Sequence, residues 1–300
     1  MSRLALNPNS DIFLKLKNNP IWWENLKNTA EVYIDIRQNA VNAYYKGGSI
    51  IKLKYDKTFS GEIASEYIPT ERIPLPGTGN RTPYQFENDN IEFSNKDIQI
   101  ATINQFSPTW MKKIKQRINR FNEPKSEKAI QGDYVVNNSY FIDSEIQFQD
   151  IRIDLVWLAV NEKKIYFVEL KTIEDRRLYY EAEETASQDK IVFQLKKYSD
   201  FIAKHKEDLI KYYSNLISIK HALGILPKGY AGPIDNLADY EVQPKPILLI
   251  GDCTRKWIAD NNKPILNKVK SHAYAVVYHG RGKYTFEAPN KDRKNVHYIC

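Results

Sequence analysis

Cysteine is scarce in this chain, and long apolar stretches are missing. Only two of the 300 residues are cysteine, Cys253 and Cys300, and they provide neither a disulfide framework nor the ligand spacing of a zinc site. No apolar run approaches the length that spans a bilayer. The segment MSRLALNPNSDIF has one basic residue and no long apolar core, so we expect no signal peptide. These absences disfavour a disulfide-rich secreted protein or a membrane partner, and they predict a location in the reducing cytoplasm.

Phosphate-binding loops and histidine clusters are missing as well. GTG at 77–79 and GRGK at 280–283 lack the spacing of a P-loop, so we interpret both as turns and expect no NTPase within the chain. The five histidines are scattered, and no pair has metal-ligand spacing on one expected element. Because we expect no NTPase in the chain, any translocation along a polymer would need a partner.

Positive charge exceeds negative charge only modestly. The chain has 44 Lys and Arg residues against 37 Asp and Glu residues, a net charge of +7. Hydrophobic residues make up 42% and charged residues 27% of the chain, which are ordinary proportions for a globular protein. This net charge weakly favours a polyanionic partner, so the position of the basic residues matters more than their sum.

The sequence divides into two expected domains. Residues 69–90 are rich in proline, glycine and asparagine, so we interpret them as a loop or linker and the best candidate boundary. We therefore expect a smaller β-rich domain over residues 1–100, for recognition or assembly, and a second domain over residues 101–300. Strand-like runs separated by turn residues occupy the first of these, at 32–37, 41–47, 49–56 and 61–68.

A helix with a basic side is expected at 107–121. Ser107 is a suitable N-cap, and Pro108 fits the first turn. The apolar stripe at helical spacing consists of Trp110, Met111, Ile114, Ile118 and Phe121. The basic residues off this stripe are Lys112, Lys113, Lys115, Arg117 and Arg120. They form either a solvated face or a patch that contacts nucleic-acid phosphates.

The elements after this helix predict a mixed α/β domain. We expect a shorter helix at 125–135, followed by three strands near 140–148, 151–160 and 164–171. A long helical region at 187–222 follows, then a strand at 246–252, a helix near 254–261 and a strand within 272–280. Elements in this order form a sheet sandwiched between helices.

The stretch IRIDLVWLAVNEKKIYFVELKT, residues 151–172, carries charged residues inside two apolar strands. Asp154 lies in the first strand and Glu169 in the second, and Lys171 follows two residues later on the same side of its strand. A tight turn near 161–163 joins the two strands. We therefore expect antiparallel neighbours, with Asp154 and Glu169 side by side at one end of the sheet.

Two converging carboxylates repel each other unless a cation lies beside them. Their hard oxygens suit Mg²⁺ or Mn²⁺, which can then hold a phosphate and a water. A lysine at such a site can orient the water or stabilise charge on the phosphate. These residue types therefore suit metal-assisted phosphodiester hydrolysis. The structural alternative is an edge strand with ordinary surface charge.

On these residues the chain resembles the PD-(D/E)XK nuclease superfamily, over roughly residues 107–280. The match is Asp154 followed by Glu169-Leu170-Lys171 on two successive strands, with Ile153 in place of the proline. The family also places a glutamate on a helix upstream of the first strand. Glu127, in PKSEKAIQGDYVV, fits that place, and the competing residues are Glu123 and Glu145.

A second element, in FQLKKYSDF, is similar to the Q-x-x-x-Y motif of RecB-type and NucS-like nucleases. Gln194 and Tyr198 are four residues apart and share one helix face. In the family such residues brace the active site or contact the nucleic-acid backbone. In the alternative interpretation Tyr198 belongs to the apolar stripe of Ile191, Leu195 and Ile202.

The resemblance implies a restriction-endonuclease-like fold, with a mixed sheet flanked by helices, and a Mg²⁺-dependent DNA nuclease in which Mn²⁺ can substitute. The carboxylates of Asp154 and Glu169 and the backbone carbonyl of Leu170 would bind the metal, and Lys171 would position the attacking water. The family resemblance does not cover the first hundred residues.

Two roles remain open within this function, and a third lies outside it. The extra N-terminal domain, which could bind a partner protein, and the lack of a motor favour a restriction or anti-phage endonuclease. The Q-x-x-x-Y element favours a repair nuclease that acts on ends, flaps or mismatches. Cleavage of both strands implies a homodimer. The third possibility is a non-catalytic nucleic-acid-binding or assembly protein on the same fold.

Overall fold

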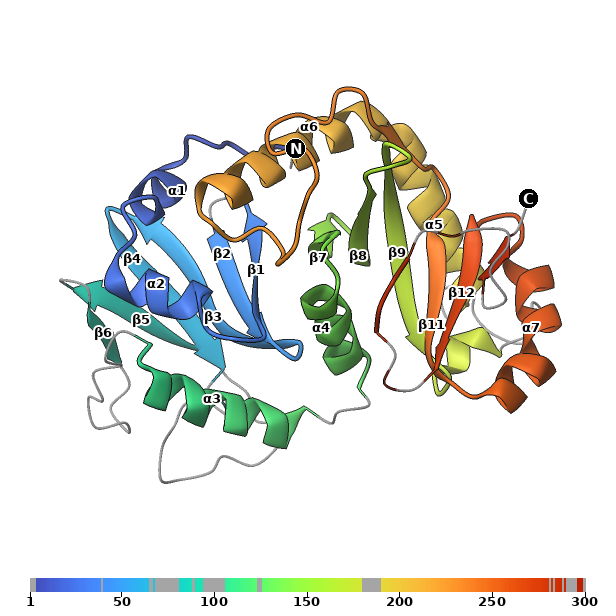
Figure 1. The fold of residues 1–300 in the computed structure, drawn as a ribbon, viewed down its shortest axis with the longest axis horizontal. Coiled ribbons are helices and arrows are strands. Elements are labelled where there is room, and N and C mark those ends of the chain that lie inside the picture. The colour runs from blue at the N-terminus through green and yellow to red at the C-terminus, as the bar shows by residue number, and fades with distance from the viewer. Residues whose placement is uncertain are drawn as a thin grey trace. The chain divides into compact units, whose positions relative to one another are not determined.

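The computed structural model describes residues 4–38, 40–64, 67, 81–87, 90–93, 106–122, 126–179, 190–280, 282, 284–287, 289 and 296–298. The chain forms two compact units (Figure 1). The N-terminal unit comprises Leu6–Val136 and Asn215–Leu226, and the C-terminal unit comprises Met1–Ala5, Asn137–Ser214 and Pro227–Cys300. The domain division expected at residues 100/101 stays a prediction. None of the described helices is long and apolar enough to cross a membrane.

The N-terminal unit contains an antiparallel sheet in which each strand pairs with the next along the chain. Its strands are β1 (Val32–Arg37), β2 (Ala40–Tyr45), β3 (Gly48–Asp56), β4 (Thr58–Ala64), β5 (Arg81–Glu87) and β6 (Asn90–Phe93). The four strands expected between residues 32 and 68 are confirmed.

One expectation for this unit was wrong. The loop expected at 69–90 contains β5, which pairs with β4 through Gly61 and Tyr84. Tyr84 and Phe86 alternate with polar residues, but the neighbouring proline, glycine and asparagine residues concealed this strand pattern. Residues 69–80 lie outside the described part of the chain. Two short helices, α1 (Asp11–Leu16) and α2 (Ile21–Lys27), precede β1, in a segment to which the sequence analysis assigned no element.

The two remaining helices of the N-terminal unit agree with expectation. The first is α3 (Pro108–Phe121), where the Ser107 hydroxyl accepts a hydrogen bond of 3.3 Å from the Trp110 N–H, and Met111, Ile114 and Ile118 are buried. The second is α4 (Glu127–Asn137). It approaches the β2–β3 turn so closely that a Cβ atom on Gly132 would lie 2.9 Å from the backbone nitrogen of Gly47.

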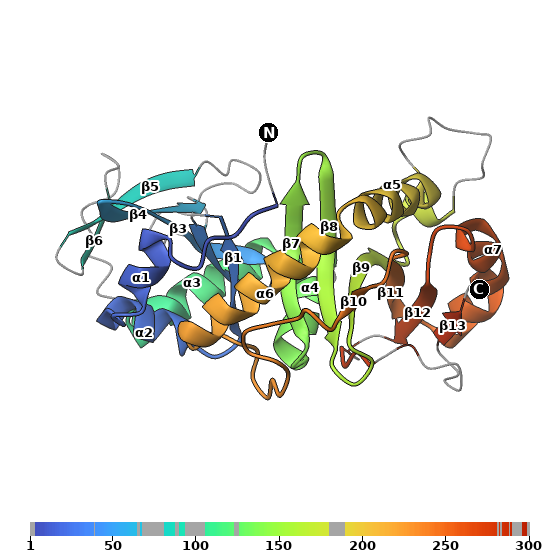
Figure 2. The same cartoon turned by 90° about the horizontal axis from the view of Figure 1, so that it is seen from above.

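The C-terminal unit contains a mixed sheet in the order β13-β12-β11-β9-β8-β7, with β10 also paired to β9. The antiparallel part consists of β7 (Phe141–Phe148), β8 (Ile151–Ala159) and β9 (Lys164–Thr172), and Figure 2 shows β7 and β8 running beside each other. The parallel part joins β9 to β11 (Ile247–Cys253) and β11 to β12 (Ala275–Gly280). The short strands are β10 (Glu241–Val242) and β13 (Val296–Tyr298).

Helices flank this sheet, so the expected mixed sheet with helices is confirmed at that level. They are the 3₁₀ helix η2 (Arg176–Leu178), α5 (Ile191–Lys204), α6 (Lys206–Ala222) and α7 (Arg255–Val269). The part of α6 from Asn215 onward belongs to the N-terminal unit. The single helical region expected at 187–222 is two helices, because the backbone leaves helical geometry at His205, with φ −116° and ψ 22°.

One face of β11 and β12 packs against α5 and α7. Leu248 and Ile250 of β11 belong to a buried cluster with Leu195 of α5 and Val269 of α7. This cluster identifies the face of the sheet that the two helices cover.

Candidate active site

The strand register places Asp154 beside Glu169. Strands β8 and β9 pair Leu155 with Val168, so Asp154 and Glu169 occupy the next pair of positions. Both strands lie inside the sheet, since β8 also pairs with β7 and β9 also pairs with β11. The alternative of an edge strand with ordinary surface charge is therefore wrong.

The parallel pairing of β9 with β11 shows which face carries the site. Glu169 pairs with Leu248 and Lys171 pairs with Ile250. Paired residues of neighbouring strands point to the same face. Glu169 and Lys171 therefore point to the face that α5 and α7 cover.

The ammonium of Lys171 joins the two carboxylates. Its Nζ atom forms an ion pair with Glu169 Oε1 and lies 3.8 Å from Asp154 Oδ2. The backbone of Leu170 takes part from both sides: its N–H donates a 2.9 Å hydrogen bond to Asp154 Oδ2, and its carbonyl accepts a 2.6 Å hydrogen bond from Lys171 Nζ. The structure thus brings together the acid, the E-x-K pair and the carbonyl that the sequence analysis selected.

Burial makes this cluster electrostatically unusual. Asp154 is 6% exposed, Glu169 is 0% exposed and Lys171 is 1% exposed. Burial first, and the negative charge of Glu169 second, raise the pKa of Asp154 to about 8, although Lys171 opposes the shift. Two buried carboxylates beside one lysine form a site where an additional cation would be stabilised.

The oxygen atoms present suit a hard divalent cation. The donors are the carboxylates of Asp154 and Glu169 and the carbonyl of Leu170. In the described part of the chain, no group of three or more His, Cys, Asp and Glu side chains could hold a metal ion. Mg²⁺ commonly keeps several waters and binds through only one or two carboxylates, so this small donor set fits it better than a metal that needs a full protein cage.

Gln194 and Tyr198 lie against the strand that carries Asp154. Gln194 Nε2 donates a 2.8 Å hydrogen bond to the Tyr198 hydroxyl, which donates in turn to the Arg152 carbonyl. Burial raises the pKa of Tyr198, and the nearby Glu169 charge adds to the rise. Tyr198 is also buried in the apolar stripe of α5, so it joins the helix core to the β8 backbone beside the carboxylates.

The sequence analysis missed two residues of this network, Asp175 and Arg177. Arg177 Nε donates to Asp175 Oδ1 at 2.9 Å, and Arg177 Nη1 donates to Gln194 Oε1 at 3.3 Å. Burial alone would raise the pKa of Asp175, but hydrogen bonds from Arg177 and the charge of Lys171 lower it overall. The acidic and basic residues directly after the lysine strand were the available signal, but such short charged runs are common in turns.

The three candidates for the upstream glutamate lie in different parts of the chain. Glu127 begins α4, which belongs to the N-terminal unit, and Glu123 lies outside the described residues. Glu145 lies on β7 opposite Asp154, because its two neighbours pair with Leu155 and Ile153. Its carboxylate accepts a 3.2 Å hydrogen bond from Arg152. The assignment of Glu127 to the site stays a prediction.

The basic residues of α3 fall into two groups. Lys112, Lys113 and Arg120 are exposed. Lys115 instead contacts the Ala30 carbonyl and lies 4.6 Å from the centre of the Tyr45 ring. Arg117 is partly buried, and this burial, followed by the charge of Arg120, lowers its pKa. Only the first group is placed as an exposed phosphate-binding surface requires.

Known proteins provide no relative from which a role can be transferred. No protein-family model, no curated protein and no solved structure matches the chain. The function therefore has to be inferred from the geometry and chemistry of the site.

Proposed function

We propose that the protein is a Mg²⁺-dependent DNA nuclease of the PD-(D/E)XK type, with Asp154, Glu169 and Lys171 as its catalytic residues. One observation carries the proposal: on two adjacent interior strands, Lys171 Nζ contacts Glu169 and lies 3.8 Å from Asp154. A buried carboxyl with a raised pKa that converges with a lysine and a second carboxylate is typical of catalytic sites.

Asp154, Glu169 and the Leu170 carbonyl would hold the metal, which when bound polarises the scissile phosphate and lowers the pKa of a bound water. Lys171 orients the attacking water and offsets the negative charge that develops on the phosphate. The Leu170 N–H fixes the Asp154 carboxylate through the 2.9 Å hydrogen bond. Gln194 and Tyr198 hold α5 against β8 and so keep the acidic side chains in place.

The charge of the cluster favours catalysis over a purely structural ion pair. In a structural pair, one cation balances one anion after both have lost their water. Here two carboxylates share one lysine, and the pKa of Asp154 rises to about 8. The protein thus retains a destabilising arrangement inside its sheet, as functional sites commonly do.

Among nuclease roles, we favour a restriction or anti-phage endonuclease that acts as a homodimer. The N-terminal unit lies outside the family resemblance and offers a surface for DNA, a partner protein or a second subunit. A repair nuclease is the second candidate, because Gln194 and Tyr198 form a hydrogen-bonded pair next to the site.

The test is a cleavage assay on supercoiled plasmid, linear duplex and single-stranded DNA, with Mg²⁺, Mn²⁺ or EDTA. We expect metal-dependent cleavage that falls at least about 100-fold in both Asp154→Ala and Lys171→Ala. Lys164→Ala, on the same strand as Lys171, is the matched control and should retain activity. Cleavage that persists in EDTA or in both site variants would refute the proposal. Binding without cleavage would instead favour the non-catalytic protein.

A further inference from the structure

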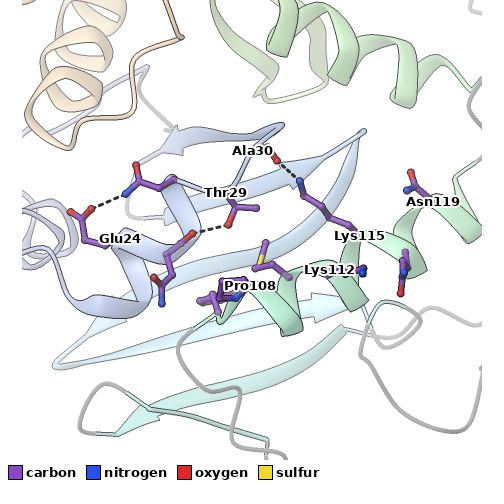
Figure 3. A pocket seen from close by; sticks show the side chains of 12 residues that line it. Glu24, Thr29, Ala30, Pro108, Lys112, Lys115 and Asn119 are labelled. Carbon is purple, nitrogen blue, oxygen red and sulfur yellow. Dashed lines mark hydrogen bonds between the residues drawn. The ribbon is translucent and has the colours of Figure 1, made fainter.

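The N-terminal unit contains a pocket beside the basic helix. Its volume is about 680 Å³, and it lies between the end of α2 with the following turn and α3, which lines it from Pro108 to Asn119 (Figure 3). This volume is within the range of sites that bind small molecules, about 300–1,000 Å³. The proposed catalytic residues belong to the C-terminal unit, so this pocket is a separate feature.

Hydrogen bonds fix both walls of the pocket. In the α2 wall, Asn28 Nδ2 donates to Glu24 Oε2 at 2.9 Å, and the Thr29 hydroxyl donates to a backbone carbonyl at 2.7 Å. Lys115 extends from α3 and connects the two walls, because its ammonium donates a hydrogen bond to the Ala30 carbonyl on the other wall (Figure 3). The pocket is therefore largely formed before any ligand enters, which lowers the entropic cost of binding.

The charges of the lining favour an anion. Lys112 and Lys115 line the pocket together with one acidic residue, Glu24, and Lys115 is already ion-paired with Glu31 at 3.6 Å. Glu24 already forms a 2.8 Å ion pair with Lys27. Lys112 is exposed and makes no ion pair with any residue that the structure describes. Its ammonium is thus available at the pocket for a phosphate group.

The uncharged part of the lining suits a nucleobase. The exposed Gln116 carboxamide supplies a paired donor and acceptor that match the edges of bases, whereas Asn28 and Asn119 already donate to Glu24 and to the Tyr45 hydroxyl. Pro108 supplies exposed apolar surface against which a flat ring can pack, while Phe106 and Met111 line the pocket but are only 1% and 2% exposed. One pocket therefore combines a cation, a hydrogen-bonding amide and an apolar wall.

We propose that this pocket binds a nucleotide, with its phosphate at Lys112 and its base against Pro108 and the Gln116 carboxamide. Such a nucleotide has two sources: it is free in solution, or it is one unit of a nucleic-acid strand. The inference does not depend on nuclease activity, and it gives the N-terminal unit a ligand of its own.

The test measures binding by calorimetry in EDTA, which prevents metal-dependent cleavage. The probes are the ribonucleoside and deoxyribonucleoside 5′-monophosphates and a ten-residue single-stranded oligonucleotide of mixed sequence. Lys112→Gln removes the cation that lines the pocket. Lys113→Gln is the matched control, because Lys113 is equally an exposed lysine of α3 but does not line the pocket.

We expect Lys112→Gln to weaken binding about tenfold, as the loss of one charge-assisted hydrogen bond does, and Lys113→Gln to have little effect. Mononucleotide binding with this pattern identifies a free nucleotide as sufficient, and binding of the oligonucleotide alone identifies a nucleotide within a strand. Equal losses in the two variants would overturn the proposal in favour of a general basic surface. Absence of binding by every probe at millimolar concentration would also overturn it.

The same experiment separates this inference from the proposed nuclease function. Asp154→Ala should leave nucleotide binding unchanged, because Asp154 belongs to the other unit. Nucleotide binding by a protein that cleaves no DNA would support the pocket and refute the nuclease. Cleavage by a protein that binds no probe would support the nuclease and refute the nucleotide-binding pocket.

Discussion

Each unit buries a lysine beside aspartate, and the two clusters differ in their charge balance. In the N-terminal unit, Lys220 Nζ lies 3.4 Å from Asp35 Oδ1, and Arg37 Nη2 lies 3.9 Å from Asp35 Oδ2. In the C-terminal unit, Lys171 contacts Glu169 and Asp154 together. Both lysines are almost fully buried, with exposed fractions of 4% for Lys220 and 1% for Lys171.

The difference favours a structural role for the first cluster and supports the proposed catalytic role of the second. Around Asp35 the named cations outnumber the named carboxylate, so no negative charge is in excess. Around Lys171 the carboxylates outnumber the lysine, and burial with Glu169 raises the pKa of Asp154 to about 8. Burying an excess carboxylate lowers the stability of the fold, and a bound cation would restore the balance. Four substitutions test this difference.

The largest expected effect is on stability, in Lys220→Met. This change leaves Asp35 buried without its lysine, so the free energy of unfolding should fall by about 3–5 kcal/mol. Urea denaturation followed by circular dichroism measures the loss. DNA cleavage by the folded protein at low temperature should be unchanged. A Lys220→Met variant as stable as the wild type would show that Lys220 does not stabilise the fold.

The next effect is on activity, in Lys171→Met. The proposed function requires this lysine to stabilise the transition state, so kcat for plasmid cleavage should fall about 100- to 1,000-fold. DNA affinity measured without metal should change little, because Lys171 is buried. Lys220→Met serves as the control for loss of a buried lysine. Equal losses of activity in Lys171→Met and Lys220→Met would show that the two clusters do not differ in function.

Asp154→Asn should abolish cleavage and yet stabilise the protein in the absence of divalent cations. The pKa of Asp154 is about 8 in the folded state, against about 3.9 in an unfolded chain. The stability contributed by protonated Asp154 is therefore complete below about pH 4 and is lost as the pH rises to about 8. Asparagine cannot ionise and escapes this loss.

The expected gain for Asp154→Asn is about 1–2 kcal/mol at pH 8, and it should shrink toward pH 5. Urea denaturation at the two pH values measures it. Glu145→Gln is the control, because Glu145 is only partly buried on the neighbouring strand. A gain that is the same at both pH values would show that ionisation of Asp154 is not its cause.

The smallest effect is expected for Tyr198→Phe, which removes the hydroxyl that donates to the Arg152 carbonyl. Stability should fall by about 1 kcal/mol, and cleavage should fall about tenfold as the support of the carboxylates loosens. Ser199→Ala is a matched control, since the Ser199 hydroxyl donates to the His272 carbonyl at 3.1 Å. It should cost similar stability without the loss of cleavage. Equal activity in the two variants would limit Tyr198 to packing.

Local sequence patterns were sufficient to predict the elements whose ends carry clear capping or turn residues. Ser107 and Pro108 marked the start of α3, and the apolar spacing from Trp110 to Phe121 marked its length. The apolar runs on either side of the 161–163 turn predicted the hairpin of β8 and β9. The patterns failed for β5, where turn-forming residues suggested a loop. They also failed at His205, where no turn-forming residue marks the break between α5 and α6.

Alternation of side chains along a strand was enough to predict that Glu169 and Lys171 share a side, and the turn at 161–163 predicted Asp154 beside Glu169. The tertiary structure was needed to show that both strands lie inside a sheet, that α5 and α7 cover the charged face, and that Arg177 contacts Gln194. It also assigned Glu127 to the other unit. Burial and pKa depend on segments that pack from distant parts of the chain, and the spacing of residues along one strand carries no record of those segments.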